Sequence, residues 1–176
     1  MLLYALLKAG IDYENHIKQG VEYLLRFYKT QGFPCVVSQE HGKFRGPGRK
    51  DDCCPYATLI MLKLLSNIPE YQKSEISKEM EMILFSLWEN SLEKHPYMFY
   101  MGTDFRKLKA PAMWFDIVSV ADVLSRFDFV KSDSRFLEMI ALIKDKQNEK
   151  GLFTPETVYQ KCKNWDFNKR SSHLHI

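Results

Sequence analysis

The chain has 176 residues, of which 45% are hydrophobic and 27% charged, and its formal net charge is +3. This length and composition predict one globular domain, residues 1–176, with a hydrophobic core. The nearly balanced charge and the lack of a nucleic-acid-binding motif argue against a nucleic-acid partner. The four cysteines include the adjacent pair Cys53 and Cys54, which suits neither a disulfide framework nor a CxxC zinc module. We therefore expect reduced thiols and a cytoplasmic protein with no signal peptide and no membrane span.

Helices of two kinds are predicted to alternate along the chain. Amphipathic helices, each with one apolar stripe, are expected at residues 13–29, 74–92 and 133–146. Their predicted N-caps are Asp12, Ser74 and the pair Ser132 and Asp133. The second of these helices is expected to bury a stripe made of Ile76, Met80, Ile83 and Leu87. These three helices are predicted to form an outer layer with one face in water.

The other helices are apolar on nearly all sides, which is typical of helices surrounded by protein. Two are expected to open at residues 54–58 and 110–114, with Pro55 and Pro111 at the first helical position. Residues 2–9 are predicted to end another such inner helix, and a further one is expected near residue 171.

The loops from outer to inner helices carry aromatic residues next to glycine or proline, at residues 30–35, 94–100 and 146–153. Helix, loop and helix recur with a period of about 60 residues, which indicates stacked helical hairpins. The sequence therefore predicts an all-α fold.

Several of these segments resemble a known superfamily. Residues 144–153 resemble the glutamine–tryptophan repeat of terpenoid cyclases, with Phe153 in place of tryptophan. Residues 54–58, 102–108, 114–116 and 164–167 resemble small prokaryotic squalene-cyclase-like proteins. The chain is thus similar to the α/α-toroid superfamily of terpenoid cyclases and protein prenyltransferases. The resemblance implies a fragment of an α/α toroid, a half barrel of alternating inner and outer helices. Its exposed ring edges are expected to be covered by self-association, by a partner chain or by the rest of a longer protein.

The outer-to-inner loops are also basic, and they are expected to meet where the inner helices begin. Helix N-termini and cations together favour an anion, and aromatic rings beside them suit an apolar tail or a carbocation. The predicted ligand is an isoprenoid or other lipid diphosphate. Its predicted binding residues are Arg45, Arg49, Arg106, Lys107, Lys109, Tyr56, Tyr100, Trp114 and Trp165. The alternative is that the charges belong to solvated loops and the aromatic residues to the core.

Three carboxylates are candidates for proton transfer. Laid on the Asp-x-Asp-Asp motif of squalene-type cyclases, Asp51 takes the protonating position and Asp52 that of its partner, but Arg49 replaces the first aspartate. A neighbouring arginine would keep Asp51 ionised, which disfavours a strong acid. Asp116, in the second inner helix, is the third candidate acid or base. Its alternative is a structural role at the helix N-terminus or in a pair with Arg106 or Lys109.

The resemblance to prenyltransferases also implies a candidate zinc site. Asp52 and Cys54 have the Asp-x-Cys spacing of those enzymes, and His173 stands near the start of the next inner helix. The alternative is that Cys54 or Asp52 caps a helix. Two functions remain open: a prenyltransferase-like or terpene-cyclase-like ligand-binding toroid, and a non-catalytic protein-interaction module.

Overall fold

The computed structural model describes residues 1–34, 53–91, 105–111 and 115–162. The α-helices are α1 (Leu2–Lys8), α2 (Lys18–Leu25), α3 (Pro55–Leu65), α4 (Glu75–Glu89), α6 (Ile117–Leu124) and α7 (Ser134–Asp145). Shorter helical turns are η1 (Tyr13–Ile17), η3 (Pro69–Tyr71), η4 (Asp128–Ser132) and η5 (Gln160–Cys162). Strands β1 (Lys109–Ala110) and β2 (Thr157–Val158) form a short parallel pair. The chain is mostly helical, as its periodicity predicts.

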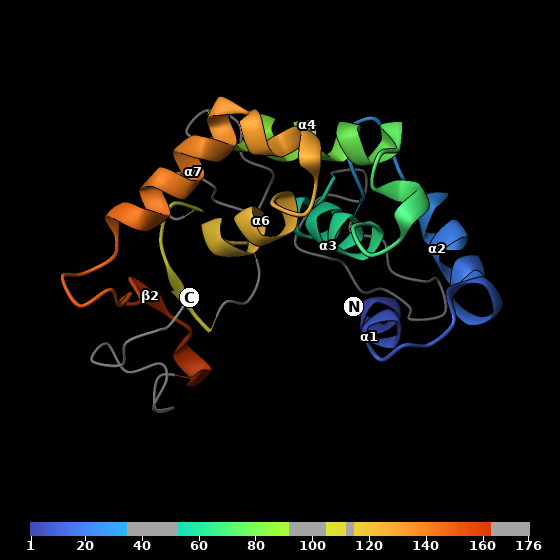
Figure 1. Ribbon diagram of the computed structural model, residues 1–176, viewed down its shortest axis with the longest axis horizontal. Helices are drawn as coiled ribbons and strands as arrows, with labels where there is room; N and C mark the ends of the chain where they lie inside the picture. Colours follow the sequence, from blue (N-terminus) through green and yellow to red (C-terminus); the bar gives the residue numbers. More distant parts are fainter. Residues whose placement is uncertain (35–52, 92–104, 112–114, 163–176) are drawn as a thin grey trace.

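The helices lie in two layers. In Figure 1, α2, α4 and α7 follow the outside of an arc, and α1, α3 and α6 lie inside it. Contacts follow the same order: α3 packs on α4 and α6, α6 packs on α7, and α1 contacts α3. Among the described helices, outer and inner ones therefore alternate along the chain, as expected from the two kinds of helical pattern.

Side-chain caps fix the starts of the outer helices. The amide of Asn15 donates to Asp12 Oδ1 at 2.8 Å, the amide of Ser77 donates to Ser74 Oγ at 3.3 Å, and the amide of Arg135 donates to the cap residue Asp133 at 2.9 Å. These bonds satisfy amides that have no partner within the helix. The caps Ser74 and Asp133 are therefore confirmed, whereas Asp12 caps the short turn η1 that precedes α2, and Ser132 belongs to η4.

The buried face of α4 differs from the predicted stripe. Met80 is fully buried, but Ile76, Ile83 and Leu87 are only half-buried. The core side of the helix is made of Ser77, Met80, Glu81, Leu84, Phe85 and Trp88. Because these positions follow the predicted ones by about one residue, the helix is rotated toward its aromatic residues, and it places the carboxylate of Glu81 inside the protein.

The start of the second inner helix is also different from the prediction. Helix α6 begins at Ile117 after the cap Asp116, rather than at Pro111. Lys109 and Ala110 instead pair with Thr157 and Val158, and the Tyr159 amide donates to the Ala110 carbonyl at 3.0 Å. The pairing with β2 keeps this backbone extended, and aspartate is a far better N-cap than alanine.

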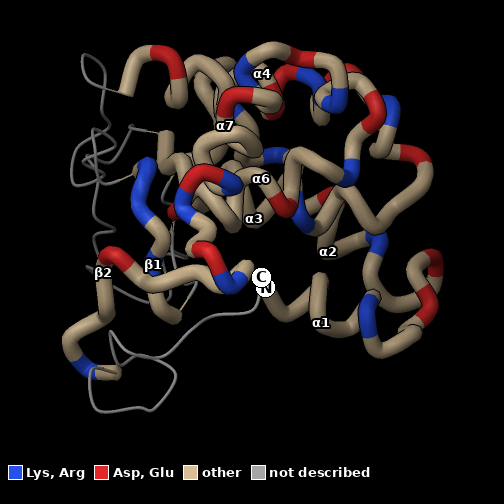
Figure 2. The backbone as a smooth tube through the Cα atoms, turned by 60° about the vertical axis from the view of Figure 1, so that its left-hand side comes forward, with Lys and Arg blue, Asp and Glu red and all other residues tan. Residues whose placement is uncertain are grey.

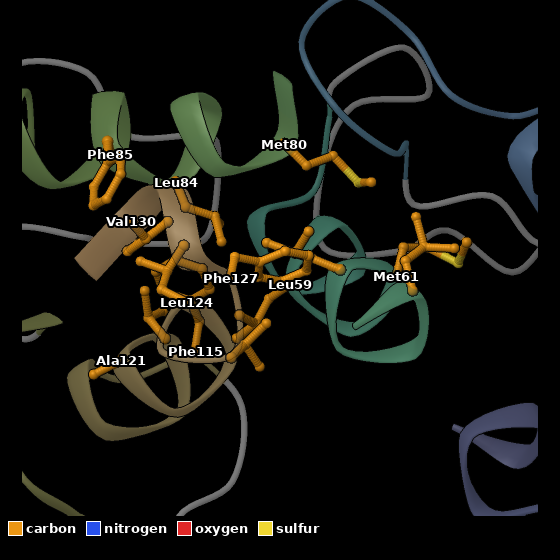
Figure 3. Packing of buried hydrophobic residues seen from close by; sticks show 14 of the residues in the cluster. Leu59, Met61, Met80, Leu84, Phe85, Phe115, Ala121, Leu124, Phe127 and Val130 are labelled. Atoms are coloured by element: carbon orange, nitrogen blue, oxygen red, sulfur yellow. The ribbon is translucent and has the colours of Figure 1, made fainter. Parts of the chain in front are cut away.

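The core lies between the two layers. Figure 3 shows side chains of α3, α4, α6 and the turn after α6 meeting there, among them Leu59, Leu84, Leu124 and Phe127. No helix within the described residues has both the length and the apolar character needed to cross a membrane. The longest described helix, α4, has 15 residues, whereas a span needs about 20.

Candidate functional site at the N-terminal ends of the inner helices

The first aromatic loop is bonded directly to the start of α3. The Cys54 amide donates to the Phe33 carbonyl at 2.6 Å, and the Phe33 amide donates to Thr58 Oγ1 at 3.0 Å. Gly32 has a φ of +108°, and a Cβ atom at this position would lie 2.5 Å from Thr58 Oγ1. Glycine is therefore required for both its backbone conformation and the close approach. The loop closes over the first turn of α3 as a result.

Cys54 is the N-cap of α3. Its Sγ accepts a hydrogen bond from the Ala57 amide at 3.4 Å, and only 6% of the residue is exposed. The neighbouring Cys53 thiol donates instead to the Gly32 carbonyl at 3.3 Å. Because adjacent side chains of an extended backbone point to opposite sides, the two thiols take different partners and do not form one dithiol site.

Asp116 caps α6 from a fully buried position. One carboxylate oxygen accepts from the Ser119 amide at 2.9 Å, and the other accepts from the Ser119 hydroxyl at 3.0 Å. Burial raises the pKa of Asp116 above its ordinary value, while the hydrogen bonds from Ser119 and the charge of Lys109 oppose that rise. The predicted candidate acid thus has both oxygens engaged in holding the helix start.

Tyr56 belongs to the start of the first of these inner helices. It lies half-buried in the first turn of α3, and burial raises its phenol pKa, with smaller contributions from Cys54 and Asp116. Helices α3 and α6 pack against one another. Cys54 and Tyr56 thus lie at the start of α3, and Asp116 lies at the start of α6.

The cations of the second loop are divided between two surroundings. Lys109 Nζ donates to the Phe115 carbonyl at 3.5 Å, next to Asp116. Arg106 instead stacks on the Trp88 ring, 4.1 Å from its centroid, and donates to Glu138 at 3.3 Å. The guanidinium of Arg106 is thus directed to the outer helices α4 and α7. Lys107 lies between them in the chain and is half-buried.

Acidic residues that sequence reasoning missed hold this segment in place. Trp88 Nε1 donates to Glu138 at 2.9 Å, so Glu138 serves both Trp88 and Arg106. Glu156 accepts from the Leu108 amide at 2.8 Å and from Lys146 at 2.6 Å. Figure 2 shows the basic segment that carries β1 with acidic residues of neighbouring segments beside it. The position of Glu156 within a basic loop could have identified it from the sequence as a partner for nearby cations.

The third aromatic loop, which resembles the repeat motif, is closed by its own polar side chains. The Gln147 side chain donates to the Gly151 carbonyl at 2.8 Å, and Asn148 Oδ1 accepts from the Leu152 amide at 2.9 Å. These bonds fold the loop back so that Phe153 is buried, with 8% exposure. The aromatic tips of the first and third loops, Phe33 and Phe153, are therefore core residues.

The other predicted site residues lie outside the described residues. They are Arg45, Arg49, Asp51, Asp52, Tyr100, Trp114, Trp165 and His173. Of the predicted zinc ligands only Cys54 is described, and its sulfur is engaged as a helix cap. Within residues 1–34, 53–91, 105–111 and 115–162, no three His, Cys, Asp or Glu side chains gather as a metal site would require. The described geometry therefore supports the capping alternative for Cys54.

A groove of about 870 Å³ lies on a different surface, along the outer side of α4. Its lining includes Tyr28, Glu79, Met82, Ile83 and Phe129, and the Tyr28 hydroxyl donates to Glu79 at 2.8 Å. Met82 and Phe129 are 43% and 56% exposed.

Comparison of the chain with protein-family models, with curated proteins and with solved structures gave no match.

Proposed function

We propose that the chain is a fragment of an α/α toroid that binds an apolar anionic ligand, such as an isoprenoid or lipid diphosphate, where α3 and α6 begin. The proposal is carried by one observation: the packed inner helices α3 and α6 start at Cys54 and Asp116, and Lys109 Nζ donates to the Phe115 carbonyl beside Asp116. A helix start carries partial positive charge, which favours an anion. Lys109 adds a full positive charge beside it.

The chemistry of the described residues favours binding over acid catalysis by Asp116. Both of its oxygens accept hydrogen bonds from Ser119, so the proton that a general acid must carry would compete with the cap of α6. A prenyltransferase-like or cyclase-like reaction would have to use Asp51 or Asp52. In the binding function, Lys109 contacts the anionic group and Tyr56 packs against the apolar tail.

Calorimetric titration with farnesyl diphosphate tests this proposal, with pyrophosphate as the ligand control. We expect saturable binding that needs the prenyl tail. Lys109→Met should weaken it about 10- to 100-fold, which corresponds to one charged hydrogen bond. Lys144→Met is the matched control, because Lys144 is exposed in the last turn of α7. Equal binding of pyrophosphate, or no binding of either compound, would contradict the proposal.

A protein-interaction module is the second candidate function, and the groove along α4 favours it. Exposed Met82 and Phe129 offer an apolar contact surface there. If farnesyl diphosphate does not bind, Met82→Glu tests this alternative through the loss of association with self or partner in sedimentation experiments. Association that is unchanged by Met82→Glu would count against the groove as an interface.

A further inference from the structure

Glu81 is a buried carboxylate in the middle of the core side of α4. The residue is 1% exposed, and its Oε2 atom has no hydrogen-bond partner among the described residues. Met80 and Leu84 flank it on the buried side of the helix, and Figure 3 shows both of these side chains directed away from α4 and toward the core. A carboxylate in such a position is costly unless it is paired or neutral.

The elements packed against α4 supply no counter-charge to Glu81 among the described residues. Helix α3 carries the titratable residues Tyr56 and Lys63, and α7 carries Arg135, Glu138, Lys144 and Asp145. Lys63 is paired with Asp122 at 3.3 Å. Each of the remaining charges that reach α4 from α7 is also engaged: Arg135 by Asp133 and Glu89, and Glu138 by Trp88 and Arg106.

On α4 itself, Lys78 is the cation nearest to Glu81 in the sequence, one turn earlier. Its ammonium group is bound to Glu75 at 2.7 Å. Lys78 lowers the pKa of Glu81, but burial has the larger effect and raises this pKa from 4.5 to about 7. Desolvation thus dominates, as expected for a carboxylate in a hydrophobic setting.

We propose that Glu81 is a proton-sensitive switch in the core, which lets α4 pack closely on α3 and α7 when protonated and loosens this packing when ionised. The structural basis is that no described residue donates a hydrogen bond to Oε2, because ionisation would then leave a full charge inside the core without a donor from these residues. The switch is independent of the proposed ligand-binding function, since it lies on α4 and not at the starts of the inner helices.

The direction of the pH effect follows from proton linkage. The folded protein holds the Glu81 proton more tightly than the unfolded chain, so protonation stabilises the fold. Below pH 4.5 both states are protonated and there is no effect. Between pH 4.5 and about 7, the unfolding constant should rise up to about 10-fold per pH unit, roughly 300-fold in all, and then level off.

Urea unfolding between pH 4 and 8.5 tests the switch in the wild type, Glu81→Gln and Glu81→Met. The pKa of Asp116 is also raised, so Asp116 contributes a pH dependence of the same sign. The contribution of Glu81 is therefore taken as the difference in pH dependence of the unfolding constant between wild type and variant. We expect both variants to lose most of the rise in the unfolding constant. The control Glu22→Gln should keep it, because Glu22 is an exposed glutamate in α2.

Carbon-13 NMR titration of the wild type reports on the same group without any substitution. We expect one glutamate carboxyl carbon with a midpoint near pH 7, and its loss in Glu81→Gln. If both variants fail to fold, the titration of the wild type alone tests whether Glu81 has a raised pKa. A wild type with no glutamate midpoint above pH 6, or variants with the wild-type pH dependence, would overturn the proposal.

Discussion

Replacement of Asp116 separates a helix-capping role from a role in proton transfer. Asp116→Ala removes the acceptors of the Ser119 amide and hydroxyl, whereas Asp116→Asn keeps a side-chain oxygen at the cap and removes the charge. Asparagine and aspartate are about equally good N-caps. The two substitutions should therefore have different effects on stability if Asp116 is mainly a cap.

The size of the effect follows from the two hydrogen bonds. Loss of an N-cap costs about 1 kcal/mol, within a range of roughly 0.5 to 2. An amide left unpaired in a buried site adds about 1 to 3 kcal/mol. The half-exposed Ser119 hydroxyl can bond to water, so we expect a total of about 2 to 3 kcal/mol for Asp116→Ala and less than about 1 kcal/mol for Asp116→Asn. In a domain of this size the Ala variant should melt roughly 5 to 10 °C lower.

Urea unfolding and thermal melting of both variants measure this difference. Asp122→Asn on the same helix is the control, because Asp122 forms solvent-exposed pairs with Lys63 and Arg126. Exposed pairs contribute only about 0 to 1 kcal/mol. Equal stability of the Ala and Asn variants would refute the capping argument. Loss of a measured turnover in Asp116→Asn, with stability unchanged, would restore Asp116 as a candidate acid.

Two further substitutions test how the aromatic segments are anchored. Gly32→Ala should destabilise the fold by about 1 to 3 kcal/mol, since it combines a positive φ with a Cβ contact of 2.5 Å to Thr58. Gly10→Ala, at a φ of +81° with no atom near the new Cβ, should cost less, and a reversed order in urea unfolding would contradict the steric argument. Trp88→Phe should cost about 1 to 3 kcal/mol, because it removes a hydrogen bond to a charged acceptor, Glu138. Trp88→Phe with wild-type thermal stability would show that the indole bond contributes little.

Local signals predicted the helix starts well. Asp12, Ser74 and Asp133 cap helices through amides only two or three residues away, so each cap depends on its own neighbourhood. The start of α3 was equally predictable, because Pro55 follows the cap residue directly. In contrast, the segment with Lys109 and Ala110 pairs with residues almost 50 positions later in the chain. Pro111 predicted a helix start at this point, but the pairing with β2 keeps the segment extended and α6 begins later, at Ile117.

The site was less predictable than the fold for a related reason. Lysine and arginine positions in a sequence do not reveal which carboxylates will meet them after folding. Arg106 was predicted to face the ligand, but Glu138, 32 residues away, and Trp88 take its guanidinium. The alternative that some of the basic residues belong to ordinary surface contacts therefore applies to Arg106. Lys109, beside Phe115 and Asp116, keeps the position that the ligand-binding proposal requires.

Glu81 was not recognised as a candidate in the sequence because the buried face of its helix was predicted about one residue away from its true position. On the predicted stripe of Ile76, Met80 and Ile83, position 81 would be a marginal site where a carboxylate could reach water. The actual core side includes Leu84 and Trp88, and it carries position 81 inward. A turn of about 100° separates neighbouring residues on a helix, so a rotation by one residue moves a charge from the edge of the buried face into its centre. The bulky Phe85 and Trp88 explain this rotation, because they bury more apolar surface than the isoleucines they displace.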